Sequence, residues 1–370
     1  EVDTLSLHDA LPIFSLLRRN RQTSRKDLVK LMGVSKNTVS IIVDQYIKEG
    51  VIREVGVKDL HKAGRPKILI ELNPNVFKAA GFVIHHDGIE YVVTNYDLNI
   101  VKRGFEKMET ENPLTIFNRI KEMALGFLSE YPEMLGVGIG VPGIVNSNEG
   151  IVYESTNLKW KNINVTNLLK NDLPIPFIVQ NSVKMASLCS NIFGESPSHS
   201  SLFYIRIGNG VGGAFLIGEQ IWNGDSWTSG EIGHISVNAD GPHCACGQKG
   251  CLEVMINKKA FIGWSEGFKE LSKEEQEKLI EERLKQYGNY LGISLISVIN
   301  MMNPKEIIID SPYNQHAIFQ KSLNDYLQTN ALKIPYENTK IYFNDKTYSP
   351  TLGAATAVIL NYEKVGNGSA

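Results

Sequence analysis

The sequence predicts an α/β body of two lobes with a cleft between them, preceded by a small winged helix-turn-helix domain. Three observations support this prediction. A basic segment with helical periodicity opens the chain, an alternation of strands and helical stretches begins near residue 78, and the same order of strands returns after residue 200. With 370 residues, 42% hydrophobic and 21% charged, the chain is long enough for two or three domains with substantial cores.

Charge is unevenly distributed along the chain. Residues 14–70 contain 13 Lys and Arg against 5 Asp and Glu, although the whole chain has a net charge of −2. A basic head on an acidic body indicates a polyanion-binding module joined to a second unit. No apolar run approaches a membrane span and no secretory signal opens the sequence, so we expect no membrane partner and a cytoplasmic location. Residues 1–13 do not match the pattern that follows and are expected to be a non-native or disordered leader.

Residues 23–52 have the pattern of two short helices joined by a turn. Ser24, followed by Asp27, is typical of a helix start, Gly33 permits the turn, and Ser35 is expected to cap the second helix. The N-terminal end of that helix is where a recognition helix meets bases and phosphates. The candidate DNA-binding residues are Ser35, Lys36, Asn37, Thr38, Ser40 and Arg65.

A β-hairpin, the wing, is predicted after Gly50, from alternating strands over residues 51–55 and 67–72. Between them, Arg65 lies between Gly64 and Pro66 on a chain that the proline keeps extended, which suits a narrow A·T-rich minor groove. The alternative is a solvated basic hairpin in a protein-binding winged helix. Because charge and motif agree, residues 14–72 are predicted to bind double-stranded operator DNA.

The body has two halves with the same predicted order of elements. The first lobe is expected over residues 78–190, completed by a C-terminal helix over 350–362, and the second over 191–349. Strands and helices are expected, in order, at 79–86, 88–97, 98–108, 113–130 (helix), 135–145, 201–218 (two strands with a Gly-rich turn), 257–301 (a long charged helical region) and 305–312.

Three of the four cysteines lie within the stretch GPHCACGQKGCLE, residues 241–253. So few cysteines in a long chain argue against a disulfide scaffold, and clustered thiols are then metal ligands more often than not. Zinc takes four ligands, and the candidates for the fourth are His234 and His243, beside Cys244, Cys246 and Cys251. The alternative, three buried thiols, is disfavoured because the loop is polar. Three sulfurs and one nitrogen leave no open position, so the Zn²⁺ would be structural.

The cysteine stretch, preceded by SGEIGH, resembles the signature of the ROK family of bacterial sugar kinases and sugar-responsive repressors. The resemblance covers residues 14–362 and includes GVGIGVPGIV, VQNSVKMAS, YIRIGNGVGG and LGAATAVIL. The head, with AGRPKILIELNP, resembles the repressor branch, and the whole looks most like its xylose-repressor type.

This resemblance implies an actin-like, hexokinase-like two-lobed fold and zinc held by His234 and the three cysteines. It also implies a sugar site, since carboxylates and amides pair well with sugar hydroxyls. The residues that match the family's sugar-binding positions are Gly143, Thr156, Asn181, Glu231, His234 and Glu253. His234 would bind metal through one ring nitrogen and face the sugar with the other.

The chain departs from the family's kinases at two motifs. The kinases have Asn-Asp, with the Asp as base, where this chain has Asn181 and Ser182, and a serine hydroxyl is a poor base at neutral pH. Their Asp-x-Gly-x-Thr phosphate turn corresponds to residues 83–87, which lack the glycine and threonine. The chain is therefore expected to be not an enzyme but a repressor of a carbohydrate-utilisation operon. We expect it to bind an inverted repeat as a homodimer or higher oligomer. A monosaccharide inducer is expected to release it from the DNA. A sugar kinase with an appended head, and a repressor controlled by a protein partner, are the alternatives.

Overall fold

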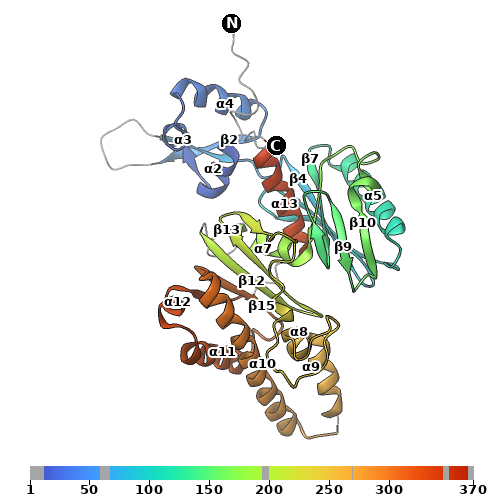
Figure 1. Cartoon of the computed structure of the whole chain (residues 1–370). Coiled ribbons are helices and arrows are strands. Elements are labelled where there is room, and N and C mark those ends of the chain that lie inside the picture. The colour runs from blue at the N-terminus through green and yellow to red at the C-terminus, as the bar shows by residue number, and fades with distance from the viewer. Residues whose placement is uncertain (1–11, 59–66, 194–199, 269, 345–349, 366–370) are drawn as a thin grey trace.

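A computed structural model of the chain describes residues 12–58, 67–193, 200–268, 270–344 and 350–365. These residues form a small head and two lobes, each lobe built on a five-stranded sheet (Figure 1). The α/β architecture predicted from the sequence is confirmed. No helix of the described residues is long and apolar enough to cross a bilayer.

The head consists of three helices and a three-stranded sheet of order β1-β3-β2. Its elements are α2 (Pro12–Asn20), β1 (Thr23–Ser24), α3 (Arg25–Met32), α4 (Lys36–Lys48), β2 (Ile52–Lys58) and β3 (Lys67–Leu72). The expected caps are present: the Ser24 hydroxyl accepts from the amide of Asp27, and the Ser35 hydroxyl accepts from the amide of Thr38. Gly33 adopts a φ of 69°, which allows the tight turn between α3 and α4.

The start of the head differs from the prediction. Pro12 and Ile13 belong to α2, and Ile13 is fully buried in the head's core. The leader expected over residues 1–13 thus overlaps α2 at Pro12 and Ile13, and its nature stays a prediction. Residues 1–11 lie outside the part that the structure describes.

Lobe 1 is a mixed sheet of order β11-β7-β4-β5-β6. It has an outer three-stranded sheet, β10-β9-β8, beside it. The bounds are β4 (Lys78–His85), β5 (Gly88–Asn95), β6 (Ile100–Lys107), α5 (Pro113–Glu130), β7 (Met134–Val141), β8 (Ile144–Asn146), β9 (Ile151–Ser155), β10 (Trp160–Asn164), α6 (Val165–Leu169), β11 (Phe177–Asn181) and α7 (Ser182–Phe193).

Lobe 2 repeats this strand order as β14-β13-β12-β15-β16. In both lobes a three-stranded antiparallel meander is extended by two parallel strands. The sequence pattern predicted the similar order of the two halves but not β11, β14, β16 or the parallel pairing. The bounds are β12 (Ser201–Ile207), β13 (Val211–Ile217), β14 (Gln220–Trp222), the 3₁₀ turn η1 (Ile232–His234), α8 (Leu252–Ile256), α9 (Lys258–Ser265), the 3₁₀ turn η2 (Glu266–Phe268), α10 (Lys273–Met302), β15 (Glu306–Asp310), α11 (Ala317–Asn330), α12 (Lys333–Asn338) and β16 (Lys340–Phe343).

The helical region expected near residues 257–301 is present and is divided into α9 and α10. A new helix begins at Lys273 because Ser272 and Glu275 form a reciprocal capping box, which satisfies free amides of the first turn.

Two helices, α7 and α13 (Pro350–Val365), lie between the two sheets (Figure 1). Glycines allow this close packing. A Cβ at Gly81 would lie 2.0 Å from the carbonyl oxygen of Thr351, and one at Gly353 would lie 2.0 Å from that of Met185. α13 therefore packs against the lobe 1 sheet on one side and against α7 on the other. α7 in turn packs on the lobe 2 sheet.

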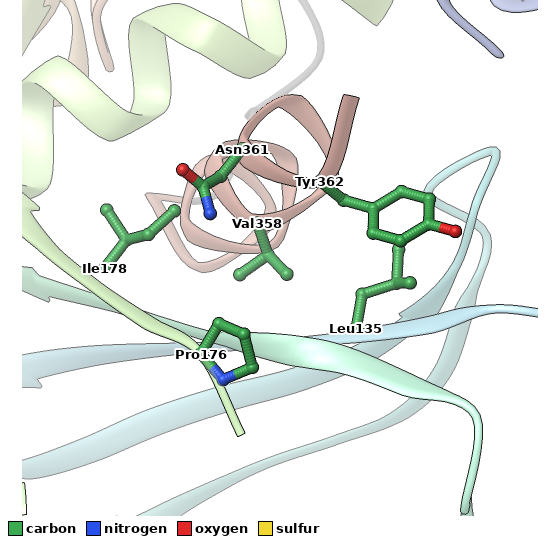
Figure 2. Close-up of a pocket in the computed structure, with 6 residues that line it drawn as sticks. All are labelled: Leu135, Pro176, Ile178, Val358, Asn361 and Tyr362. Atoms are coloured by element: carbon green, nitrogen blue, oxygen red, sulfur yellow. The ribbon is translucent and has the colours of Figure 1, made fainter. Parts of the chain in front are cut away.

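An apolar cavity of about 90 Å³ lies under the last turns of α13 (Figure 2). Val358, Asn361 and Tyr362 line it from the helix, Leu135 and Ile178 from the sheet, and Pro176 from the residue before β11. None of the sequence-predicted site residues lines this cavity, so it reflects the packing of α13.

Candidate functional site

The structure brings together one histidine and three cysteines in lobe 2. The ligand atoms of His234, Cys244, Cys246 and Cys251 all lie within 4.8 Å of one another. His234 ends the 3₁₀ turn η1, and Cys251 is the residue before α8. These four residues are therefore positioned to bind a metal ion. His243, the other candidate for the fourth ligand, is not part of this cluster. Its backbone pairs with that of Lys249 in an isolated β-bridge.

Glycine allows the chain to bend around this cluster. Gly250 has a φ of 61°, and a Cβ there would lie 1.6 Å from the carbonyl oxygen of Asn238. Gly247, in the turn between Cys246 and Cys251, has a φ of 95°. L residues with side chains rarely adopt such backbone conformations, so the loop geometry depends on these glycines.

The distances within the cluster fit a tetrahedral ion. A tetrahedron with metal–sulfur bonds of about 2.3 Å has ligand-to-ligand edges of about 3.8 Å. Sγ of Cys246 lies 3.6 Å from Sγ of Cys251, and Sγ of Cys244 lies 3.6 Å from Nδ1 of His234. Burial and the neighbouring thiols raise the pKa of Cys251 to about 12. A cation among the sulfurs favours their charged form, which is the form that binds metal.

The other nitrogen of the His234 ring faces a carboxylate. Nε2 lies 3.9 Å from Oε2 of Glu231, while Nδ1 faces Cys244. Burial raises the pKa of Glu231 and the nearby Glu253 adds to the rise, whereas His234 and Lys184 oppose it. Two carboxylates and an imidazole thus lie within electrostatic reach of one another beside the metal-ligand cluster.

Glu253 also supports the Gly-rich turn between β12 and β13. Its Oε2 accepts a 2.9 Å hydrogen bond from the amide of Val211. A Cβ at Gly210 would lie 2.8 Å from the same oxygen, so a glycine is needed for the carboxylate to approach. One carboxylate oxygen is therefore bound within the protein.

On the lobe 1 side, Asn181 is tied into the fold. Its Nδ2 donates to the carbonyl of Gly143 at 2.8 Å, and its Oδ1 accepts from the amides of Val183 and Lys184 at the start of α7. Only the second Nδ2 hydrogen is left for a ligand. Thr156 is exposed just after β9, whose Ser155 backbone lies against Gly143.

Sequence reasoning missed a buried lysine beside this group. Lys184 is 3% exposed, and its Nζ donates to the carbonyl of Trp227 at 2.8 Å and to Oδ1 of Asn223 at 3.2 Å. Burial lowers its pKa to about 8, although Glu231 opposes the fall. The available signal was a lysine within VQNSVKMAS, three residues after Asn181.

The head presents the predicted recognition residues at the start of α4. Ser35, Lys36 and Asn37 are exposed, and Thr38 and Ser40 are partly so. The Ser35 and Thr38 hydroxyls are hydrogen-bonded to each other at 2.8 Å, so their first role is to cap the helix. Arg65, the predicted minor-groove residue, lies outside the described residues.

Sequence reasoning also missed Ile41, which is 46% exposed on the same helix. It was assigned to no face, because only its neighbours Ile42 and Val43 fit the buried stripe of α4. An exposed apolar side chain here could contact thymine methyl groups.

The described residues thus combine a two-lobed α/β fold, a compact S₃N cluster in one lobe and a helix-turn-helix head with a β-hairpin. The ROK family model matches residues 84–360, and the chain belongs to this family.

Two curated relatives have most of their length in common with the chain. The xylose repressor of Bacillus subtilis (strain 168) is 27% identical over 303 residues, which covers 79% of this chain and 78% of that protein. The DNA-binding transcriptional dual regulator NagC of Escherichia coli (strain K12) is 22% identical over 383 residues, covering 96% and 93%.

Solved structures show the same fold. A ROK family transcriptional regulator, a homolog of the E. coli MLC protein, superposes with a TM-score of 0.82 at 21% identity and covers 99% of this chain and 98% of that one. The ROK hexokinase of Thermus thermophilus has a TM-score of 0.64 at 19% identity and covers 78% of this chain and 99% of that one. The similarity thus extends over the head in the regulator and over a smaller share of the chain in the hexokinase.

Proposed function

We propose that the chain is a sugar-responsive transcriptional repressor that leaves its operator when a monosaccharide binds between the lobes. The observation that carries this proposal is the combination in one chain of an exposed helix-turn-helix surface and a carboxylate group beside a metal-ligand cluster. Relatives that share most of this length are named as a xylose repressor and as an N-acetylglucosamine repressor. D-xylose is the first candidate inducer because of the xylose repressors among them.

The proposed sugar site is formed by Glu231, His234 and Glu253 from lobe 2, with Asn181, Gly143 and Thr156 on the lobe 1 side. Carboxylates accept from sugar hydroxyls, and the remaining Asn181 hydrogen can donate to one. In this proposal the ion is zinc, with a structural role: its ligands fix the ring of His234 and the start of α8, which bears Glu253.

The proposal excludes kinase activity. Ser182 follows Asn181 at the start of α7, where the family's kinases have their base. The β4–β5 turn consists of His86 and Asp87, because His85 is paired directly with Gly88. The Asp87 carboxylate at this turn would repel an approaching phosphate.

The test begins with DNA selection. Purified protein is incubated with a random duplex library, and we expect enrichment of an inverted repeat, because two heads of a symmetric dimer read two half-sites. A panel of monosaccharides is then added to the complex, and one of them should release the DNA. If no duplex is enriched, the repressor assignment is wrong. If a duplex is enriched but no sugar releases it, control by a protein partner replaces control by sugar.

A further inference from the structure

Arg18, in the first helix of the head, contacts both lobes of the body. Its Nε lies 2.8 Å from Oε1 of Glu363 near the end of α13, and its Nη2 lies 3.2 Å from Oε2 of Glu219 in lobe 2. Arg19 also pairs with Glu219, at 3.0 Å, and the Tyr96 hydroxyl donates to Glu363 at 2.6 Å. Figure 1 shows α13 extending from between the lobes toward the head.

These charges are removed from water. The side chain of Arg18 is 6% exposed, that of Glu363 is 4% exposed and that of Glu219 is 14% exposed. A buried charge that loses its partner strongly destabilises the folded state. The position of α2 against the body therefore depends on both carboxylates. Phe14 of the same helix packs on Tyr362 and Phe77, with ring centroids 5.7 and 6.2 Å away. The junction between α2 and the body is therefore packed as well as charged.

Glu219 is adjacent to a short strand that leads toward the proposed sugar site. Strand β14 begins at Gln220 and ends at Trp222, and the next residue is Asn223. Oδ1 of Asn223 accepts from Nζ of Lys184 at 3.2 Å and from Nε2 of Gln180 at 3.3 Å. Lys184 also donates to the carbonyl of Trp227, in the loop that continues to Glu231.

The two ends of β14 are thus held by different parts of the molecule. At about 3.3 Å per residue, Glu219 and Asn223 are separated by roughly 13 Å of extended chain. The strand is paired with β13 through three register positions, so its ends cannot move independently by much.

We propose that β14 is the mechanical link between the ligand site and the DNA-binding head, with Arg18 as the positioning residue at its far end. A ligand that engages Glu231 alters the loop held by Lys184, and the displacement of Asn223 is transmitted to Glu219. Arg18 bridges Glu219 in lobe 2 and Glu363 on α13, so any movement between these carboxylates tilts α2. The inference rests on the proposed function for its ligand, but the link itself is a property of the ligand-free chain.

A purely static junction gives a different result from a link. In a static junction, breaking Arg18–Glu219 loosens α2, but a change at Lys184, at the other end of β14, does not. If β14 is a link, both changes loosen α2, and the change at Lys184 adds nothing once the Arg18–Glu219 pair is broken. A double-mutant cycle separates the two.

The first experiment measures amide hydrogen exchange of α2 in the full chain without ligand. We expect Glu219→Gln and Lys184→Met each to speed α2 exchange by at least about threefold, and the double variant to equal Glu219→Gln alone. Asn223→Ala, which removes the shared acceptor, should reproduce Lys184→Met. The matched control is Asp97→Asn, which removes the Arg21–Asp97 ion pair of 3.9 Å between head and lobe 1 without touching β14. In the Asp97→Asn variant, Lys184→Met should still speed the exchange of α2 by its full factor.

If neither Lys184→Met nor Asn223→Ala changes the exchange of α2, the link is wrong. It is also wrong if the effects of Lys184→Met and Glu219→Gln on α2 exchange are fully additive in the double variant. The second experiment adds D-xylose to the full chain on a selected duplex. Glu219→Gln and Arg18→Lys should show the wild-type thermal shift with the sugar but require at least about tenfold more of it for DNA release. Wild-type release in both variants overturns the link while the repressor function stands. If D-xylose neither binds nor releases DNA, the choice of ligand fails, and the ligand-free cycle still decides the link.

Discussion

The ring of His234 presents Nε2 to the carboxylate of Glu231, with 3.9 Å between Nε2 and Oε2. The opposite nitrogen of the same ring faces Sγ of Cys244. One side chain is therefore shared by the metal-ligand cluster and the proposed sugar site. When Nδ1 ligates an ion, the proton of a neutral ring must be on Nε2, which then points toward Glu231 as a donor.

Zinc content is the first prediction. Protein purified without chelators should contain about one zinc per chain. Cys246→Ser should lose the metal and lower the thermal stability of lobe 2, because three remaining ligands do not close the site. The matched control is Cys189→Ser, since Cys189 is buried in α7 away from the cluster. Retention of zinc by Cys246→Ser, or its loss in Cys189→Ser, would contradict the assignment.

Glu231 provides a test of the sugar site. Glu231→Ala should forfeit roughly 1.5–3 kcal/mol of charge-assisted hydrogen bonding to the inducer. DNA affinity without sugar should survive, because Glu231 lies in lobe 2 of the body and not in the head. The variant is thus expected to hold the operator but not to release it. The control is Glu266→Ala, an exposed carboxylate of the same lobe. Release of Glu231→Ala at the wild-type sugar concentration would rule this site out.

Several features could be read from the sequence because they depend on local chemistry. Ser24, Gly33 and Ser35 act within three or four residues of their own position, so their patterns predict the caps and turn that form. The thiol cluster is nearly as local, since Cys244 and Cys251 are seven residues apart in a glycine-rich loop. The repeated order of strands followed from apolar periodicity alone.

The contacts that join distant segments could not be read in this way. Arg18 and Glu363 are 345 positions apart, and nothing in the sequence near either residue marks the other as a partner. The hydrogen bonds of Lys184 also join distant segments, because its acceptors Asn223 and Trp227 come from lobe 2. Such pairs are set by how the lobes and head pack, and a single sequence carries no local signal of them.

DNA binding can be tested within one helix. Lys36 lies at the exposed N-terminal end of α4 and Lys48 at its C-terminal end. If the N-terminal end enters the major groove and Lys36 pairs with a phosphate, Lys36→Ala should weaken binding and reduce the slope of log affinity against log salt by about one. Lys48→Ala should have a much smaller effect. Equal effects of the two substitutions would mean that α4 is not oriented as proposed.

Kinase activity should be absent in the wild type and should not be restored by one substitution. Ser182→Asp replaces the missing base, but the acidic turn of His86 and Asp87 remains where the phosphates would approach. Coupled assays with ATP and common monosaccharides should therefore stay at background for both proteins. A turnover on the order of 1 per second in the wild type would instead make the chain an ordinary sugar kinase.

The last prediction concerns the charge of Lys184. Burial lowers its pKa to about 8, whereas an unfolded lysine titrates near 10.4. Between these values the unfolded chain holds more of this proton than the folded chain, so the contribution of Lys184 to the free energy of unfolding rises with pH and is constant below about pH 8.

Urea unfolding of wild type and Lys184→Met from pH 7 to 10 measures this contribution as the difference between the two free energies of unfolding. The difference should shift in favour of the wild type as pH rises from 8 toward 10, by at most about 1.4 kcal/mol per pH unit. Glu231 is the charged group that opposes the fall in the pKa of Lys184. The matched control is Lys170→Met, at an exposed lysine of lobe 1. Parallel curves for Lys184→Met would show that its ammonium is not held in a dry site, and would remove the electrostatic part of its proposed hold on the loop before Glu231.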